Sequence, residues 1–159
     1  MLLREVMEKA ILPALAILPA KMDTQQARVM LLAIGLQESE FTHRRQMGNG
    51  PARGFWQFEK GGGVKGVMQH PASAPYVRAV CEVRGVPFDR YAVWAALETD
   101  DVFAAAIARL LLWTDAKALP AIDDAKESWS LYSRVWNPGK PHPDKWPANH
   151  DLARLEVIR

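Results

Sequence analysis

Two glutamates, Glu38 and Glu40, stand near the end of the segment with the clearest helical pattern in the chain. A carboxyl group withdrawn from water holds its proton to a higher pH, which a general acid working near neutral pH requires. Such an acid protonates a leaving oxygen, as in cleavage of a glycosidic bond. A carboxylate at a helix end also commonly turns to solvent or pairs with an arginine, so residue type alone does not show that either glutamate is catalytic.

The helix that must position these glutamates is predicted from Thr24 to about Glu40, because this stretch lacks proline and contains glycine only at Gly35. Asp23 followed by Gln26 resembles a capping arrangement at its start. Apolar residues fall on nearly every side of the helix, which is typical of a helix buried at the centre of a domain.

Periodicity places both glutamates in line with apolar residues. At 3.6 residues per turn, Glu38 continues one apolar stripe and Glu40 continues another. The stripes are Ala27, Leu31 and Ile34 with Met30 on one side, and Val29, Ala33 and Leu36 on the other. The period of the helix therefore leaves both glutamates as candidates.

The residues around Glu38 resemble a known motif. Gln37-Glu38-Ser39-Glu40-Phe41 is similar to the Glu-Ser-x-Phe that ends the catalytic helix of lytic transglycosylases and goose-type lysozymes. The resemblance implies that Glu38 is the catalytic glutamate, that Ser39 belongs to the substrate site, and that Glu40 occupies the variable position.

A second segment, Gly50-Pro51-Ala52-Arg53-Gly54-Phe55-Trp56-Gln57, takes the place of that family's Gly-Ala-x-Gly-Leu-Met-Gln-like loop. Gly54 and Gln57 are retained, while the pair Phe55-Trp56 replaces the usual residues and implies a differently shaped cleft wall. The flat faces of Trp56 and Phe55 suit sugar rings, and Gln57 offers a donor and an acceptor. Gly54, Trp56 and Gln57 are therefore predicted to bind substrate.

A third segment, Trp136-Asn137-Pro138-Gly139, resembles the family's Tyr-Asn-x-Gly on the far side of the cleft, with Trp in place of Tyr. Trp136 and Asn137 are accordingly predicted to bind substrate. Because Trp136 lacks a hydroxyl, Tyr132, one helical turn earlier, is the candidate to supply a phenol to Glu38.

The resemblance implies an enzyme that cleaves the β-1,4 bond between N-acetylmuramic acid and N-acetylglucosamine in peptidoglycan, with no cofactor. In transglycosylases of this family one glutamate acts as acid and then as base on the muramyl C6 hydroxyl, giving a 1,6-anhydro sugar. Hydrolysis would use a second carboxylate. Glu59, just after the loop, is the best candidate for it, so both reactions remain open.

Two other classes of function remain open from the sequence. One is a non-catalytic glycan-binding protein, or a structural part of a phage particle, built on a lysozyme-like scaffold. The other is an unrelated helical interaction domain in which the three matches arise by chance.

Composition predicts one domain over residues 1–159, because 49% apolar residues suffice for a full core. A net charge of +2 does not indicate nucleic-acid binding, and a monomer is favoured. The single Cys81 excludes an internal disulfide, and the four histidines lack the spacing of metal ligands. Gly61-Gly62-Gly63 lacks the context of a phosphate loop and is interpreted as a flexible turn.

Further helices are expected at Ser73 to Arg84, Tyr91 to Leu97, Thr99 to Trp113 and Asp123 to Trp136, followed by a proline-rich tail and a short final helix. The pairs Asp100-Asp101 and Asp123-Asp124 are expected to cap two of them. These helices predict a mainly α fold, and the resemblance implies that it is of the α+β lysozyme-like kind, with a Gly-rich cleft loop or small strand region.

The first twenty residues resemble a signal peptide only at first sight. Glu5 and Glu8 stand where positive charge is wanted, and Pro13 and Pro19 interrupt an apolar run too short to cross a bilayer. We expect a first helix that packs into the core, and no membrane insertion. A protein acting on the cell wall would then need release by lysis or delivery in a particle, which favours a phage or prophage product.

Overall fold

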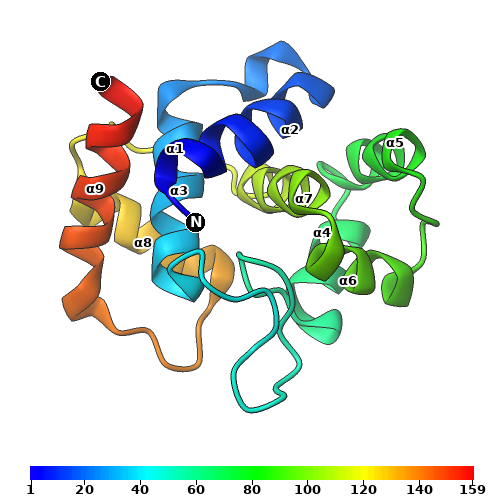
Figure 1. Ribbon diagram of the computed structural model, residues 1–159. Coiled ribbons are helices and arrows are strands. Elements are labelled where there is room, and N and C mark those ends of the chain that lie inside the picture. The colour runs from blue at the N-terminus through cyan, green and yellow to red at the C-terminus, as the bar shows by residue number, and fades with distance from the viewer.

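A computed structural model describes residues 1–159 and contains the expected central helix as α3, Gln25–Ser39 (Figure 1). The hydroxyl oxygen of Thr24 accepts a 3.1 Å hydrogen bond from the backbone N–H of Ala27 and caps the helix. Asp23 instead forms an ion pair with Arg28 at 2.8 Å. The predicted helix is confirmed, and its cap lies one residue later than the Asp23 pattern indicated.

Helix α3 is buried on most of its circumference, as expected. It packs against α9 (Trp146–Ile158) on one side and against α7 (Asp101–Trp113) on another, so that it runs through the middle of the molecule (Figure 1). All residues from Val29 to Gly35 are buried. The C-terminal end of α3 points toward the long loop of residues 42–59, and this loop and the end of α3 together carry the candidate site.

The N-terminal segment forms the predicted core-packed helix, in three joined parts: α1 (Leu3–Val6), a π-helical turn (Met7–Ile11) and α2 (Leu12–Ile17). The backbone N–H of Leu12 bonds to the carbonyl of Met7, five residues back. Pro13 has no N–H to donate and would crowd a regular turn, and the wider π turn accommodates it. A short 3₁₀ turn, Ala20–Met22, then leads into α3.

The remaining helices lie close to their predicted positions. They are α5 (Ala74–Arg84), α6 (Arg90–Thr99), α7 and α8 (Ala125–Trp136). Asp100 accepts a hydrogen bond from the backbone N–H of Phe103, and Asp124 accepts one from that of Glu127. Both capping predictions are confirmed.

The final helix is longer than predicted. Residues 138–142 form an extended loop, a 3₁₀ turn follows at Pro143–Lys145, and α9 then runs for 13 residues from Trp146. Pro147 lies in the first turn of α9, where the backbone N–H that proline lacks would have no partner in the helix. The predicted proline-rich tail is therefore partly the start of a helix.

The expected flexible turn at Gly61-Gly62-Gly63 is wrong. These glycines lie in a π-helical turn (Lys60–Val64) that continues into α4 (Lys65–Gln69). Val64 and Val67 are fully buried on its inner side. Burial of these valines therefore outweighs the poor helix propensity of glycine.

The small strand region is not confirmed as a strand. The loop contains only isolated antiparallel bridges, between Arg45 and Arg53 and between Arg53 and Phe58. The fold is mainly helical, with 66% of residues in helices and 2% in strand, and forms a single compact domain. No helix is long and apolar enough to cross a membrane.

Candidate active site

The site begins where α3 ends in a sharp reversal. Glu40 and Phe41 both have positive φ angles, 54° and 55°, a conformation that side chains other than glycine adopt at a cost. The reversal folds the ring of Phe41 back onto Gly35, where a Cβ atom would lie only 2.0 Å from the ring. Phe41 also makes edge contacts with Phe55 and Trp56. The one glycine of the helix thus provides the space that fixes how α3 ends.

Glu38 lies in the last turn of α3, partly buried and open to a cleft. Its Oε1 accepts a 2.8 Å hydrogen bond from the hydroxyl of Tyr132 in α8. Burial raises the pKa of Glu38 to about 7, while the hydrogen bond from Tyr132 acts in the opposite direction. Near neutral pH this carboxyl is therefore able both to give and to take a proton.

Tyr132 is held rigidly behind the glutamate. Its ring stacks on Trp146 of α9 with centroids 5.1 Å apart and planes at 10°, and it also contacts Trp129 and Trp136. Burial and the neighbouring Glu38 raise the pKa of Tyr132, so the phenol remains a hydrogen-bond donor across the physiological range. The predicted phenol contact to Glu38 is confirmed.

Glu40 does not share this environment. Helix α3 ends at Ser39, so Glu40 leaves the apolar stripe on which its sequence position placed it. Its side chain is exposed at the rim of the same cleft. Of the two candidates left open by periodicity, only Glu38 lies in surroundings that suit a general acid.

Ser39 is buried, with 2% of its surface exposed, and its hydroxyl is used within the protein. It donates to the carbonyl of Phe55 at 2.7 Å and accepts from the backbone N–H of Phe41 at 3.1 Å. Ser39 borders the cleft, but its hydroxyl proton is already used within the protein, so its predicted contact with substrate stays a prediction. Ser39 ties the loop to the end of α3 and thereby positions the cleft wall beside Glu38.

Trp56 and Phe55 were predicted to offer their faces to sugar rings, and the structure contradicts this. Each has 1% of its surface exposed. The indole N–H of Trp56 donates to the carbonyl of Leu31 inside the domain at 2.8 Å. Both rings belong to the core, because the loop turns them inward against α3 and Phe41.

Gly54 has a structural role instead of contacting substrate. It has a φ of 78°, and a Cβ atom there would lie 2.7 Å from the carbonyl oxygen of Leu97. Only glycine allows the loop to pass this close to α6 with that backbone angle. Gly54 does not line the cleft, so the prediction that it binds substrate is wrong.

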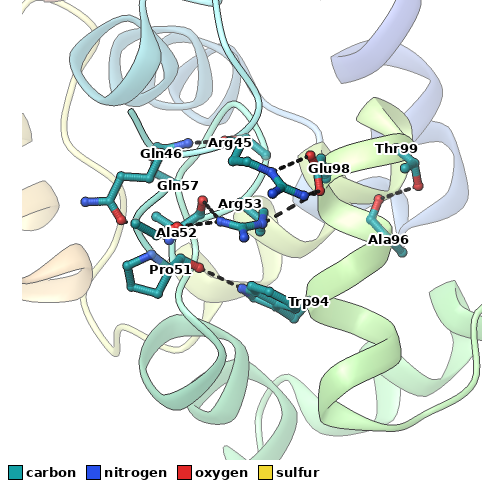
Figure 2. A network of polar contacts seen from close by, with 12 residues as sticks. Arg45, Gln46, Pro51, Ala52, Arg53, Gln57, Trp94, Ala96, Glu98 and Thr99 are labelled. Atoms are coloured by element: carbon teal, nitrogen blue, oxygen red, sulfur yellow. Dashed lines mark hydrogen bonds and ion pairs between the residues drawn. The ribbon is translucent and has the colours of Figure 1, made fainter. Parts of the chain in front are cut away.

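Figure 2 shows how polar contacts fasten the loop to α6. Arg45 binds Glu98 through two nitrogens at 3.0 and 3.3 Å, and Arg53 approaches the same carboxylate at 3.6 Å. The Arg53 guanidinium lies 4.5 Å from the centroid of the Trp94 ring, and the indole N–H of Trp94 donates to the carbonyl of Pro51 at 2.8 Å. These contacts hold the loop on the side opposite to α3.

Gln57 lines the cleft, as predicted. It has a φ of 54°, and its amide nitrogen donates to the carbonyl of Gly54 at 2.9 Å. The amide oxygen of Gln57 makes no hydrogen bond within the protein, so it is free to accept one from a ligand.

Trp136 and Asn137, at the end of α8, also line the cleft. The indole N–H of Trp136 donates to the carbonyl of Trp56 at 3.0 Å, and its ring meets Phe58 edge-on at 5.6 Å. Asn137 ends α8 with a φ of 46°, and its exposed amide has no partner in the protein. The third segment thus lies across from the first, as predicted, although it shares no helix with it.

Another wall of the cleft is the loop of residues 138–142 with the turn that follows it, of which only Pro138 and Gly139 belong to the predicted third segment. Its position is set by Gln37, whose amide nitrogen donates to the carbonyls of Pro141 and His142, both at 2.9 Å. Asn149 of α9 in turn donates to the amide oxygen of Gln37 at 2.9 Å. Because Gln37 directly precedes Glu38 in α3, these bonds tie the wall to the helical turn that carries Glu38.

These walls enclose a cleft of about 760 Å³ in which Glu38 lies with Gln57, Glu59, Tyr132, Trp136 and Asn137. Glu59 is exposed and also lines a second hollow beside Trp94 and Lys60. Cleft residues that the sequence reasoning missed are Gln37, Thr42, His43, Gln46, Met47, Lys140, His142 and Lys145. Most of them stand on loops without periodicity, so no sequence pattern distinguished them.

The cleft combines one carboxyl that can transfer a proton with polar side chains that can bind a ligand. A carboxyl with a pKa of about 7 faces a space lined by side-chain amides, hydroxyls and imidazoles. No group of three or more His, Cys, Asp or Glu side chains is arranged to hold a metal ion.

Comparisons with known protein families, with curated proteins and with solved structures gave no match. The function of the chain is therefore inferred from the residues and geometry of this cleft.

Proposed function

We propose that the protein cleaves the glycan strands of peptidoglycan at the β-1,4 bond between N-acetylmuramic acid and N-acetylglucosamine, with Glu38 as general acid and base. The observation that carries the proposal is that Glu38 is partly buried and yet opens into a cleft. Burial raises the pKa of its carboxyl to about 7, and the carboxyl opens into a cleft of about 760 Å³. Such a group holds a proton near neutral pH and delivers it to a glycosidic oxygen.

The hydrogen bond from Tyr132 suits the second step, in which the ionised Glu38 acts as a base. Once Glu38 has given its proton, the resulting carboxylate keeps the 2.8 Å hydrogen bond from the phenol. Tyr132 thereby favours the charged form and limits how far burial raises the pKa. Glu38 would then take a proton from the next nucleophile, either the muramyl C6 hydroxyl or water.

The remaining cleft residues have the chemistry of saccharide binding. The free amide oxygen of Gln57 and the amide of Asn137 suit hydroxyl and N-acetyl groups. The partly exposed ring of Trp136 offers an apolar face. Trp136 takes the role that the sequence pattern had given to Trp56.

Two reaction courses remain within this proposal. With Glu38 as the only reacting carboxyl, attack by the C6 hydroxyl gives a 1,6-anhydro sugar. Glu59 lines the same cleft and is the candidate second carboxylate for hydrolysis by water. Glu40 lines it as well, at the rim.

The test is digestion of purified peptidoglycan by the wild type and by Glu38→Gln, with the released muropeptides identified by mass. Anhydro-muropeptides that disappear with Glu38→Gln would support transglycosylation. Products with reducing ends that disappear in the same variant would support hydrolysis. Release of nothing by the folded wild type would contradict an enzymatic function and leave a non-catalytic glycan-binding or particle protein.

A further inference from the structure

The charged side chains of the cleft are segregated. Its carboxylates, Glu38, Glu40 and Glu59, come from the end of α3 and from the adjoining loop. Its two lysines, Lys140 and Lys145, both come from the wall between α8 and α9. A ligand in the cleft therefore meets negative charge on one side and positive charge on the other.

Neither lysine is used by the protein itself. The side chains of Lys140 and Lys145 are exposed and form no ion pair or side-chain hydrogen bond. By contrast, most arginines near the cleft have acidic partners: Arg44 binds Asp101, and Arg45 binds Glu98. The two ammonium groups are therefore free to bind an anionic group of a ligand.

The wall that carries the lysines is held in place by hydrogen bonds to α3. Gln37 bonds to two consecutive carbonyls of the wall, at Pro141 and His142, and Asn149 holds Gln37. His142 has a φ of 50°, a conformation that persists only where surrounding contacts impose it. Because Gln37 precedes Glu38, these bonds hold the backbone of the wall close to the turn of α3 that carries the carboxyl.

We infer that Lys140 and Lys145 form a subsite for a carboxylate of the N-acetylmuramic acid substituent, either the free lactyl carboxylate or one on the peptide stem that is amide-linked to it, so that the cleft selects strands bearing acidic substituents. The inference rests on the proposed function, since it assigns the cleft to this glycan. N-acetylglucosamine is neutral, and the fixed anions of the strand are on the lactyl group or on the peptide stem attached to it. The rest of the cleft contributes the three glutamates and no lysine or arginine, so only this wall offers unpaired ammonium groups to an anion.

The experiment measures binding, so that it does not depend on catalysis. Three oligosaccharides of equal length are titrated by calorimetry into protein carrying Glu38→Gln: stem-bearing strands, strands stripped of peptide but retaining the lactyl carboxylate, and neutral N-acetylglucosamine oligomers. The same titrations are repeated after adding Lys140→Ala and Lys145→Ala. The matched control adds Lys65→Ala and Lys126→Ala, which remove two exposed, unpaired lysines that do not line the cleft.

For stem-bearing strands, we expect the Kd to rise about tenfold when Lys140 and Lys145 are removed, with the control unchanged. The effect should shrink at high salt, and neutral oligomers should bind equally to all three proteins. The lactyl carboxyl is free in stripped strands and amide-linked in stem-bearing strands. A loss for stripped strands would therefore show that the lysines bind the lactyl carboxylate, and a loss confined to stem-bearing strands would place the contact on a carboxylate of the peptide. An unchanged Kd, an equal loss in the control, or no binding of any oligosaccharide would overturn the subsite.

Cleavage of peptidoglycan by the wild type, assayed alongside, separates the two proposals. Cleavage together with lysine-independent binding would overturn only the subsite. Lysine-dependent binding without cleavage would retain the subsite and overturn the enzymatic function.

Discussion

The hydroxyl of Tyr132 donates a 2.8 Å hydrogen bond to Oε1 of Glu38 and joins the C-terminal halves of two helices that are far apart in the sequence. Tyr132 is itself stacked on Trp146 of α9. The three helices α3, α8 and α9 thus meet at one carboxyl, which is buried enough for its pKa to rise to about 7 and still faces the cleft.

Replacing Tyr132 by Phe should move the alkaline limb of the pH–activity profile upward. The phenol lowers the pKa of Glu38, so its removal leaves burial unopposed and raises that pKa further. Because the acid acts in its protonated form, activity should persist to a pH about one unit higher. Profiles of kcat/KM against pH for the wild type and Tyr132→Phe measure the shift.

The matched control is Tyr76→Phe, since Tyr76 lies in α5 and does not line the cleft. Its profile should coincide with that of the wild type. A downward shift of the alkaline limb in Tyr132→Phe would show that the hydrogen bond does not stabilise the carboxylate.

Glu38→Gln should stabilise the protein at alkaline pH. The pKa of Glu38 in the folded protein, about 7, exceeds its ordinary value of 4.5, so the folded state binds the proton more tightly than the unfolded state. The wild type therefore loses stability as pH rises from about 4.5 to 7, and the variant does not. Above pH 7 the variant's free energy of unfolding should exceed that of the wild type by up to about 3 kcal/mol.

Urea unfolding at several pH values checks this difference between the two proteins. Below about pH 4 it should nearly vanish, because the carboxyl is then protonated in both the folded and the unfolded state. A difference that is the same at every pH would indicate that the carboxyl is not titrated in this range.

Gly35→Ala should lower the free energy of unfolding by about 1–3 kcal/mol, although alanine is the better helix former. The added methyl group would overlap the ring of Phe41 and push it out of its place at the end of α3. The comparison is Gly66→Ala in α4, where nothing lies within 4 Å and a gain of up to about 1 kcal/mol is expected. Equal effects of the two substitutions would contradict the role given to Gly35.

Trp56→Phe and Trp136→Phe should show which of the two tryptophans stabilises the core and which contacts the glycan. Trp56→Phe removes a buried indole and its hydrogen bond to Leu31, so stability should fall by about 2 kcal/mol or more while KM for glycan stays unchanged. Trp136→Phe should raise KM by about three- to tenfold with a smaller loss of stability. Thermal unfolding and kinetics on soluble glycan oligomers distinguish them, and a raised KM for Trp56→Phe alone would reverse the assignment.

The sequence predicted most of the helical framework because the signals there are local. Apolar periodicity located α3, and aspartates at helix starts located α7 and α8. The same periodicity placed Glu38 in line with buried residues. The contact between Tyr132 and Glu38 came from the resemblance of three segments, since nothing local links residues in two different helices.

What the sequence could not provide depends on tertiary contacts. Trp56 and Phe55 carry the same chemistry whether they face a cleft or a core, and their inward orientation depends on contacts formed in the folded protein, such as those with Phe41. Helix α4 forms despite its glycines because its valines are buried.

The wall that carries Lys140 has no periodicity, so its place was not predictable. Its position at the cleft depends on hydrogen bonds from Gln37, about a hundred residues earlier in the chain.

The most direct measurement of the central claim compares Glu38→Gln with Glu40→Gln in the rate of muropeptide release from purified peptidoglycan. The two glutamates lie two residues apart, and both line the cleft, but only Glu38 is partly buried and bonded to Tyr132. Loss of the general acid should lower the rate of Glu38→Gln by at least about 100-fold, while Glu40→Gln stays close to the wild type. Equal rates for Glu38→Gln and the wild type, or a selective loss in Glu40→Gln, would contradict the assignment of Glu38 as the acid.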